Sequence, residues 1–249
     1  MFTDVSLPYV NIPINHMQQK YNWDCGISCV LMVLPPDKRN NLLKNFSEIC
    51  ADEGFFKRQV FKLKNFNTWT IDLCYLLLRY NIPHKYCTIT LGVHPDYVNQ
   101  NFYDKILLKD EVRVNKKFAQ AANRGVSIRK RSLSDVDLQH HLSECGPVIL
   151  LTNANLLHCQ VCNSSRSFSD ELKACLPWRS GNSSVKGPVQ YHGHYIVLCG
   201  YNMSEQSYLY RNPTYKDKIC SMTYTAMTQA RKSHGTDEDA ILIFQRKWI

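Results

Sequence analysis

Cys25 lies between Asp24 and Gly26 at the start of an apolar stretch, "CGISCVLMVL", which predicts a helix. The helix dipole and the free N–H groups of a first turn favour a thiolate at this position. Gln19, six residues earlier, could donate an amide N–H to an oxyanion, and the backbone N–H of Cys25 would be the second donor. The stretch therefore predicts a nucleophilic cysteine, although cysteine is also a common small core residue, the role expected for Cys29.

A histidine and an asparagine far along the chain would complete a catalytic set. Segments 194–202 and 207–213 are apolar and bounded by turn residues, so they predict the two strands of a hairpin. A hairpin that turns near residue 203 or 204 places His194 opposite Asn212. The Asn212 oxygen would accept a hydrogen from one ring nitrogen and leave the other as a base. With Cys25, these residues would form a Cys–His–Asn triad in the chain order of papain-like enzymes.

Each of these positions also has an ordinary structural interpretation. His194 suits a hydrogen-bonded core histidine, and Asn212 before Pro213 is typical of a turn. His192 competes for the role of base. We favour His194 because Gly193 precedes it and permits a close approach, and because its pairing with Asn212 fits the hairpin.

A second group of residues has the spacing of a metal site. Cys159 and Cys162 form a CxxC pair that follows His158, and Cys175 comes later in the same segment. Two thiolates on a tight turn can hold one Zn²⁺, with a third or fourth ligand from Cys175, His158 or His192. A single CxxC pair is most often a pair of incidental free thiols, and a redox pair is the remaining alternative. A structural zinc site is therefore one of three interpretations of this segment.

The elements that would position these residues change in character along the chain. Helices are expected at 25–34, 38–52, 70–80, 97–105, 110–124 and 134–142, and strands at 84–90, 146–153, 194–202, 207–213 and 239–245. This distribution predicts an α+β fold in which a helical N-terminal half packs on a C-terminal antiparallel sheet. We expect a single domain over residues 1–249, with an extended arm at about 1–16 and an irregular cysteine-bearing insertion loop at 158–192.

The composition limits the classes of function. The 249 residues are 44% hydrophobic and 20% charged, which is typical of a folded domain and not of a disordered chain. The net charge of +9 is spread along the chain and indicates a solvated basic surface or an acidic protein partner, and no nucleic-acid-binding module accompanies it. The 11 cysteines, without a signal peptide before them, predict a cytoplasmic or nuclear location and not secretion. No apolar run is long enough to span a membrane.

Six segments are distinctive: "QQKYNWDCGISCVLMVL", "TWTIDLCYLLLRY", "TLGVHPDYVNQNFY", "GHYIVLCGYN", "YRNPTYKDKICSMT" and "ARKSHGTDEDAILIF". Together they resemble the guanylyl cyclase domain-containing protein family of animals and plants. The Asp-Cys-Gly and Gly-His cores are more distantly similar to the cysteine peptidase domains that process bacteriocin leader peptides, and this resemblance implies a papain-like fold. The third triad position of those domains is usually Asp before Pro, where this chain has Asn212 before Pro213, and either side chain can orient a histidine.

The family name implies conversion of GTP to cyclic GMP, which would require Mg²⁺ or Mn²⁺. Cyclases of the mammalian type hold their metal ions on paired carboxylates. The densest acidic stretch here, "GTDEDA", is expected to be a turn before a strand, and the sequence has no GxxxxGK[ST] phosphate loop. We therefore favour a papain-like cysteine hydrolase that acts on a peptide or isopeptide bond and needs no cofactor. A guanylyl cyclase is the first alternative, and a catalytically silent interaction protein is the second.

Overall fold

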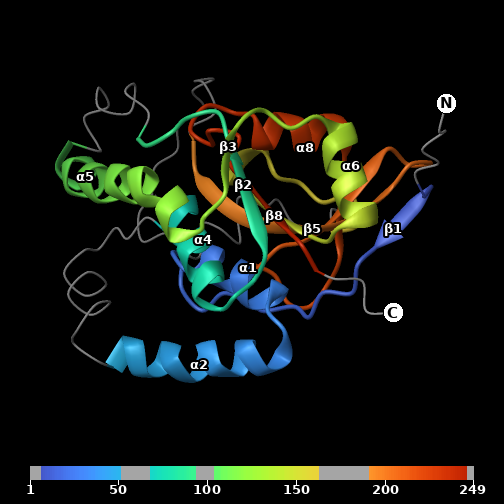
Figure 1. Ribbon diagram of the computed structural model, residues 1–249. Helices are drawn as coiled ribbons and strands as arrows, with labels where there is room; N and C mark the ends of the chain where they lie inside the picture. Colours follow the sequence, from blue (N-terminus) through green and yellow to red (C-terminus); the bar gives the residue numbers. More distant parts are fainter. Residues whose placement is uncertain (1–6, 52–67, 94–103, 163–190, 246–249) are drawn as a thin grey trace, which may run out of the picture.

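The computed structural model describes residues 7–51, 68–93, 104–162 and 191–245 (Figure 1). The helices are α1 (Cys25–Val33), α2 (Pro36–Ala51), α4 (Thr70–Arg79), α5 (Asp104–Gln120), α6 (Asp135–Glu144) and α8 (Tyr224–Arg231), with short 3₁₀ turns η2 (Ala122–Arg124) and η3 (Ala154–Leu156). The strands are β1 (Tyr9–Asn11), β2 (His84–Thr88), β3 (Ile128–Lys130), β4 (Val148–Asn153), β5 (Gly193–Asn202), β6 (Ser207–Arg211), β7 (Cys220–Thr223) and β8 (Ala240–Ile243). Across these ranges, no helix has the length and apolar character needed to cross a membrane.

The described strands belong to one sheet. Its order is β3-β2-β8-β4-β5-β6-β7, and β1, from the expected N-terminal arm, pairs with the last residues of β5. β2 and β3 run parallel, and the other neighbours run antiparallel. β4 pairs with the first part of β5. From Gly200 onward, β1 pairs with β5 along the same edge, where β4 has ended. Gly200 permits this approach, because a Cβ at that position would collide with the carbonyl oxygen of Val10.

Helices cover both faces of the sheet, with α1 and α2 on one side and α6 and α8 on the other (Figure 1). Tyr195 and Val197 of β5 belong to the core that contains the buried residues of α1 and α4. Ile196 and Leu198 belong to the core that contains those of α6 and α8. Since side chains alternate along a strand, β5 is buried on both faces, which explains its nearly continuous apolar sequence.

An α+β fold with a mostly antiparallel sheet is confirmed, but the expected separation into a helical half and a sheet half is wrong. β1 and β2 come from the N-terminal half and join the same sheet, whereas α8 lies in the C-terminal half. β3, β7 and α8 are not among the elements expected from the sequence. β3 and β7 have only three and four residues, too few for a readable period, and they are strands because of partners elsewhere in the chain.

Element boundaries differ from the expected ones where proline and capping chemistry act. Pro36, expected to end the first helix, begins α2, because proline fits the first turn of a helix. α5 begins at Asp104, earlier than expected, and the helix expected at 97–105 lies almost entirely outside the described residues. The start of α6 is confirmed: Ser134 accepts a hydrogen bond from the backbone N–H of Asp137, and the Asp137 carboxylate accepts one from that of Ser134.

Candidate active site

His194 and Asn212 lie together at one end of the β5–β6 hairpin, as the sequence predicts. Nε2 of His194 is 2.9 Å from Oδ1 of Asn212, and both side chains are buried. The expected register is wrong, however, because the hairpin turns later than expected, with Asn202 paired to Ser207. Beyond a bulge between Leu198 and Gly200, the last pair joins Val197 to Arg211. Asn212 therefore reaches His194 along a diagonal between the strands and not from the directly opposite position.

Thr214 fixes the hydrogen-bonding roles of both side chains. Its backbone N–H donates to Oδ1 of Asn212 at 3.0 Å, which identifies that atom as the carboxamide oxygen. Because an amide oxygen only accepts, Nε2 of His194 carries the hydrogen and Nδ1 holds the lone pair. The Thr214 hydroxyl also lies 3.5 Å from His194 Nε2. Thr214 is not among the expected site residues, although the turn-forming "NPT" sequence is a signal that could identify it.

Cys25 begins α1 and packs against the strand that carries His194. The backbone N–H of Tyr195, the residue that follows His194, donates a hydrogen bond to the sulfur of Cys25. Gly26 allows the helix to come this close, because a Cβ there would lie 3.0 Å from Leu73 and 3.1 Å from the Tyr195 ring. The hydrogen bonds found among the described residues do not include one between the Cys25 thiol and the His194 ring. The fold thus brings Cys25 to β5 one position away from His194.

Burial keeps both groups uncharged. It raises the pKa of the Cys25 thiol to about 11. It lowers the pKa of His194 to about 4, although the hydrogen bond with Asn212 acts in the opposite direction. The helix N-terminus is expected to stabilise a thiolate at Cys25, but burial of the sulfur raises its pKa more than the helix dipole lowers it. At neutral pH the pair consists of a thiol and an imidazole, and Cys25 must transfer its proton in order to react.

Asp24 takes the N-cap position of α1, but its side chain does not cap the helix as the position suggests. Its carboxylate instead accepts hydrogen bonds from the backbone N–H groups of Lys20 at 3.0 Å and Tyr21 at 3.1 Å. Burial raises the pKa of Asp24. These contacts fix the turn that leads into Cys25 and leave the first-turn N–H groups of α1 without a side-chain cap.

Gln19 is connected to the histidine through Thr214. Its backbone N–H donates to the Pro213 carbonyl at 2.9 Å, and its Oε1 accepts from the Thr214 hydroxyl at 3.3 Å. Its Nε2 donates to the Tyr21 carbonyl at 2.8 Å, which uses one of its two amide hydrogens. The structure therefore brings Gln19 close to the turn that orients His194, while its oxyanion role stays a prediction.

His192, the competing base, is held differently from His194. Its backbone N–H donates to Oδ1 of Asn153, and its carbonyl accepts from Ala154. Burial lowers its pKa. Because Asn212 orients His194, the contacts favour His194 as the base.

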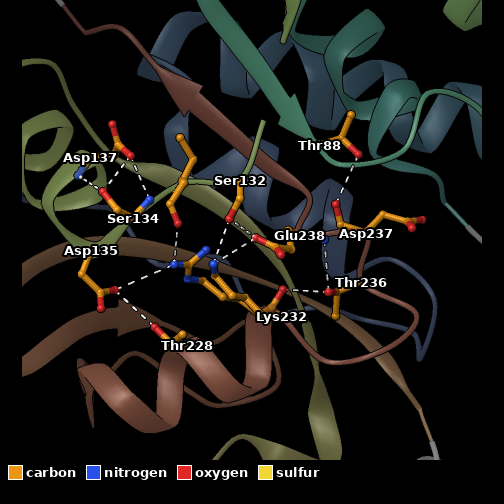
Figure 2. Close-up of polar contacts among 12 residues, drawn as sticks. Thr88, Ser132, Ser134, Asp135, Asp137, Thr228, Lys232, Thr236, Asp237 and Glu238 are labelled. Carbon is orange, nitrogen blue, oxygen red and sulfur yellow. Dashed lines mark hydrogen bonds and ion pairs between the residues drawn. The ribbon is translucent and has the colours of Figure 1, made fainter. Parts of the chain in front are cut away.

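The acidic stretch "GTDEDA" is a turn before β8, as expected (Figure 2). Asp237 and Glu238 have φ angles of 49° and 52°. Their carboxylates face different neighbours: Asp237 accepts from the Thr90 hydroxyl and Glu238 from the Ser132 hydroxyl. Asp239, the next residue, is buried. These acids therefore stabilise the turn and do not converge as a carboxylate pair for metal ions.

Cys159 and Cys162 meet a third cysteine, Cys220 of β7, which the sequence analysis misses. Their three sulfur atoms lie within 4.8 Å of one another. Of the other expected ligands, His158 is exposed and its Nδ1 contacts a nearby backbone carbonyl, and Cys175 lies outside the described residues. No local spacing indicates Cys220, because only the fold of the C-terminal strands brings it beside the CxxC pair.

Comparison with known proteins identifies relatives along nearly the whole chain. The sequence model of a family described as "Guanylylate cyclase" matches residues 14–243. The chain is also similar to "Guanylyl cyclase 1" of Arabidopsis thaliana, with 32% identity over 248 residues, which covers 97% of this chain and 80% of that protein. All the candidate site residues described above lie within the matched region.

Proposed function

The chain belongs to the guanylylate cyclase family, and from the geometry of its site we propose that it is a cysteine-dependent hydrolase of peptide or isopeptide bonds. The observation that carries this proposal is the 2.9 Å contact between His194 Nε2 and Asn212 Oδ1, which leaves Nδ1 as an oriented base. The position of Cys25, on a helix packed against the strand of His194, supports a papain-like arrangement as part of the same proposal.

In the proposed reaction Cys25 is the nucleophile. Nδ1 of His194 takes the thiol proton as the sulfur attacks the substrate carbonyl, and Asn212 holds the imidazolium that forms. The imidazolium gives its proton to the leaving amine as the carbon–nitrogen bond breaks, which leaves a thioester on Cys25. Water, deprotonated by His194, hydrolyses the thioester, and the proton returns to the sulfur. The backbone N–H of Cys25 and the second amide hydrogen of Gln19 are the proposed donors to the oxyanion.

The remaining properties of the chain suggest the class of substrate and its location. A protein or peptide substrate follows from the reaction, and the net charge of +9 favours an acidic one. The 11 cysteines favour a reducing cytoplasmic or nuclear compartment. Hydrolysis by this route needs no cofactor. If Cys25 proves unreactive, the fold would serve instead as an interaction module.

A second candidate function is cyclisation of GTP to cyclic GMP, favoured by the family description and by the name of the Arabidopsis relative. This reaction would use Mg²⁺ or Mn²⁺ and would not need Cys25. In the described part of the chain, the carboxylates of the acidic stretch are engaged with separate neighbours, so the geometry supports the hydrolase better than the cyclase.

The test compares the reactivity of Cys25 in variants of the full chain. A peptide vinyl sulfone is added at neutral pH, and labelling at each cysteine is followed by mass spectrometry in the wild type, His194→Ala and His192→Ala. We expect His194→Ala to slow labelling of Cys25 on the order of 100-fold, the scale of general base catalysis, and His192→Ala to leave it nearly unchanged. Equal labelling in all three proteins would contradict the proposal.

Production of cyclic GMP separates the two candidate functions. The wild type and Cys25→Ala are incubated with GTP and Mn²⁺, and cyclic GMP is quantified. Metal-dependent product that survives Cys25→Ala would support the cyclase. A wild type that produces no cyclic GMP and whose Cys25 is labelled in a His194-dependent way would support the hydrolase. Absence of both activities would favour the interaction module.

A further inference from the structure

The segment that follows η3 lies along β7, which forms one edge of the sheet. The backbone N–H of Gln160 donates to the Ser221 carbonyl at 2.9 Å, and the Ser221 hydroxyl donates to Oε1 of Gln160 at 3.3 Å. Cys159 is the neighbour of Gln160 in the chain, and Cys220 is the neighbour of Ser221. The two hydrogen bonds therefore place Cys159 beside Cys220. The meeting of the three cysteines is therefore fixed by backbone pairing and does not depend on side-chain conformation alone.

The separation of the sulfur atoms suits coordination to one metal ion. Sγ of Cys162 and Sγ of Cys220 are 3.9 Å apart, and all three sulfurs fall within 4.8 Å. Thiolates at about 2.3 Å from a tetrahedral Zn²⁺ lie about 3.8 Å from one another. A disulfide would require a separation of about 2.05 Å. The observed distance thus matches two corners of a zinc tetrahedron and not a covalent bond.

The surroundings of Cys159 favour a thiolate, the form that binds a metal. The backbone N–H of Cys162 lies 3.3 Å from Sγ of Cys159, and the backbone of Ser221 also hydrogen-bonds this sulfur. The thiol of Cys220 also hydrogen-bonds this sulfur. The Lys218 side chain hydrogen-bonds Cys162. Its positive charge would offset the single negative charge of three thiolates around Zn²⁺.

We propose that Cys159, Cys162 and Cys220 form a structural zinc site that attaches the segment after η3 to the edge strand β7. Binding releases the thiol protons, and a water molecule or a further side chain completes the tetrahedron. His158 is not assigned as a ligand, because its exposed ring does not join the group of sulfur atoms within 4.8 Å. The site is separate from Cys25, His194 and Asn212, so the proposal stands whether or not the chain is a hydrolase.

Metal content of the full chain tests the site directly. The wild type is purified without chelators, and metals are measured by inductively coupled plasma mass spectrometry. We expect about one zinc ion per chain, a large loss in Cys159→Ser, Cys162→Ser and Cys220→Ser, and no loss in Cys145→Ser, which lies outside the cluster. Equal zinc in the wild type and the three cluster variants would overturn the proposal.

A second measurement avoids the risk that a cluster variant fails to fold. Zinc is removed from the wild type with a chelator under reducing conditions, and Co²⁺ is titrated in. We expect a thiolate-to-cobalt charge-transfer band that saturates near one equivalent, and displacement of the band by Zn²⁺. Absence of the band would overturn the proposal. So would a disulfide between Cys162 and Cys220 in the freshly purified protein, since it would mark a redox pair.

Discussion

Oδ1 of Asn212 accepts hydrogen bonds from His194 Nε2 at 2.9 Å and from the backbone N–H of Thr214 at 3.0 Å. The second bond fixes the orientation of the carboxamide, and the first fixes the tautomer of the ring. The backbone turn at Thr214 therefore decides which of the two ring nitrogens of His194 is the base.

This relationship predicts different results for two substitutions of Asn212. Asn212→Ala removes the acceptor, so we expect labelling of Cys25 by the vinyl sulfone to slow at least about tenfold. Asn212→Asp keeps an acceptor and adds a negative charge, so it should retain most of the reactivity and raise the pKa of His194. Identical rates in Asn212→Ala and the wild type would show that the contact does not orient the base. Circular dichroism spectra provide the control for folding.

The pH profile of Cys25 labelling should follow His194 in the wild type. Only the neutral imidazole can accept the thiol proton, so the rate should rise as the pH increases through about 4, where burial places the pKa of His194. In His194→Ala, only the free thiolate can react, and the rate should rise toward pH 11, since burial raises the pKa of Cys25 to about 11. Rates measured between pH 3.5 and 10 by rapid quench would test this. Superimposable profiles would exclude His194 as the base.

A buried histidine outside the candidate site should make the fold sensitive to acid. His141 of α6 bonds the Ile243 carbonyl at 3.0 Å, and burial lowers its pKa to about 4. The unfolded chain takes up this proton near pH 6.5, so stability is lost as the pH falls from about 6.5 to 4. The loss is roughly 3 kcal/mol for one such histidine. Urea unfolding at pH 7 and pH 4.5 should show a smaller loss in His141→Gln than in the wild type, and equal losses would contradict this assignment.

Asp239 should have the opposite dependence. Burial raises its pKa to about 7, and its Oδ1 lacks a hydrogen-bond partner in the described structure. The folded chain keeps this proton after the unfolded chain has lost it, so stability decreases as the pH rises from about 4 to about 7. Asp239→Asn has no charge to bury and should be more stable than the wild type at pH 8 by about 4 kcal/mol. At pH 4 the difference should nearly disappear. Denaturant unfolding at both pH values measures it, and a variant that is less stable at pH 8 would refute the prediction.

Gly200→Ala should detach β1 from β5. The added Cβ would meet the Val10 carbonyl oxygen, which is backbone and cannot rotate away. We expect a loss of about 1–3 kcal/mol in the free energy of unfolding and faster amide exchange in β1, with β4 and its exchange rates unaffected. Hydrogen exchange measured by mass spectrometry distinguishes these segments. Unchanged exchange in β1 would mean that the strand accommodates the methyl group.

The contact between His194 and Asn212 could be predicted because both residues belong to one hairpin with a short turn. Its register could not, since the turn is centred later than expected, with Asn202 paired to Ser207. The ladder also contains a bulge where β1 replaces β4 beside β5, a junction that depends on a distant part of the chain. The uncharged thiol of Cys25 could not be predicted from the sequence either. A helix start indicates a favourable dipole, but the desolvation that outweighs it comes from packing of α1 on β5.

The cysteine cluster shows the same limit. The CxxC spacing is local and visible in the sequence, whereas Cys220 is 58 positions from Cys162. It joins the pair because β7 follows β6 at the edge of the sheet. β7 is too short to be recognised from its own residues, so the third sulfur becomes apparent only once the strands are paired.

The order of the strands has a consequence for synthesis of the protein. β8 separates β2 from β4 and follows all the other described strands in the sequence. While the ribosome is still making residues 240–243, the nascent chain holds two strand groups, β3-β2 and β4-β5-β6-β7, with nothing between them. Each presents an unpaired apolar edge that a chaperone would need to shield. The two groups can therefore join into one sheet only after residues 240–243 have been made.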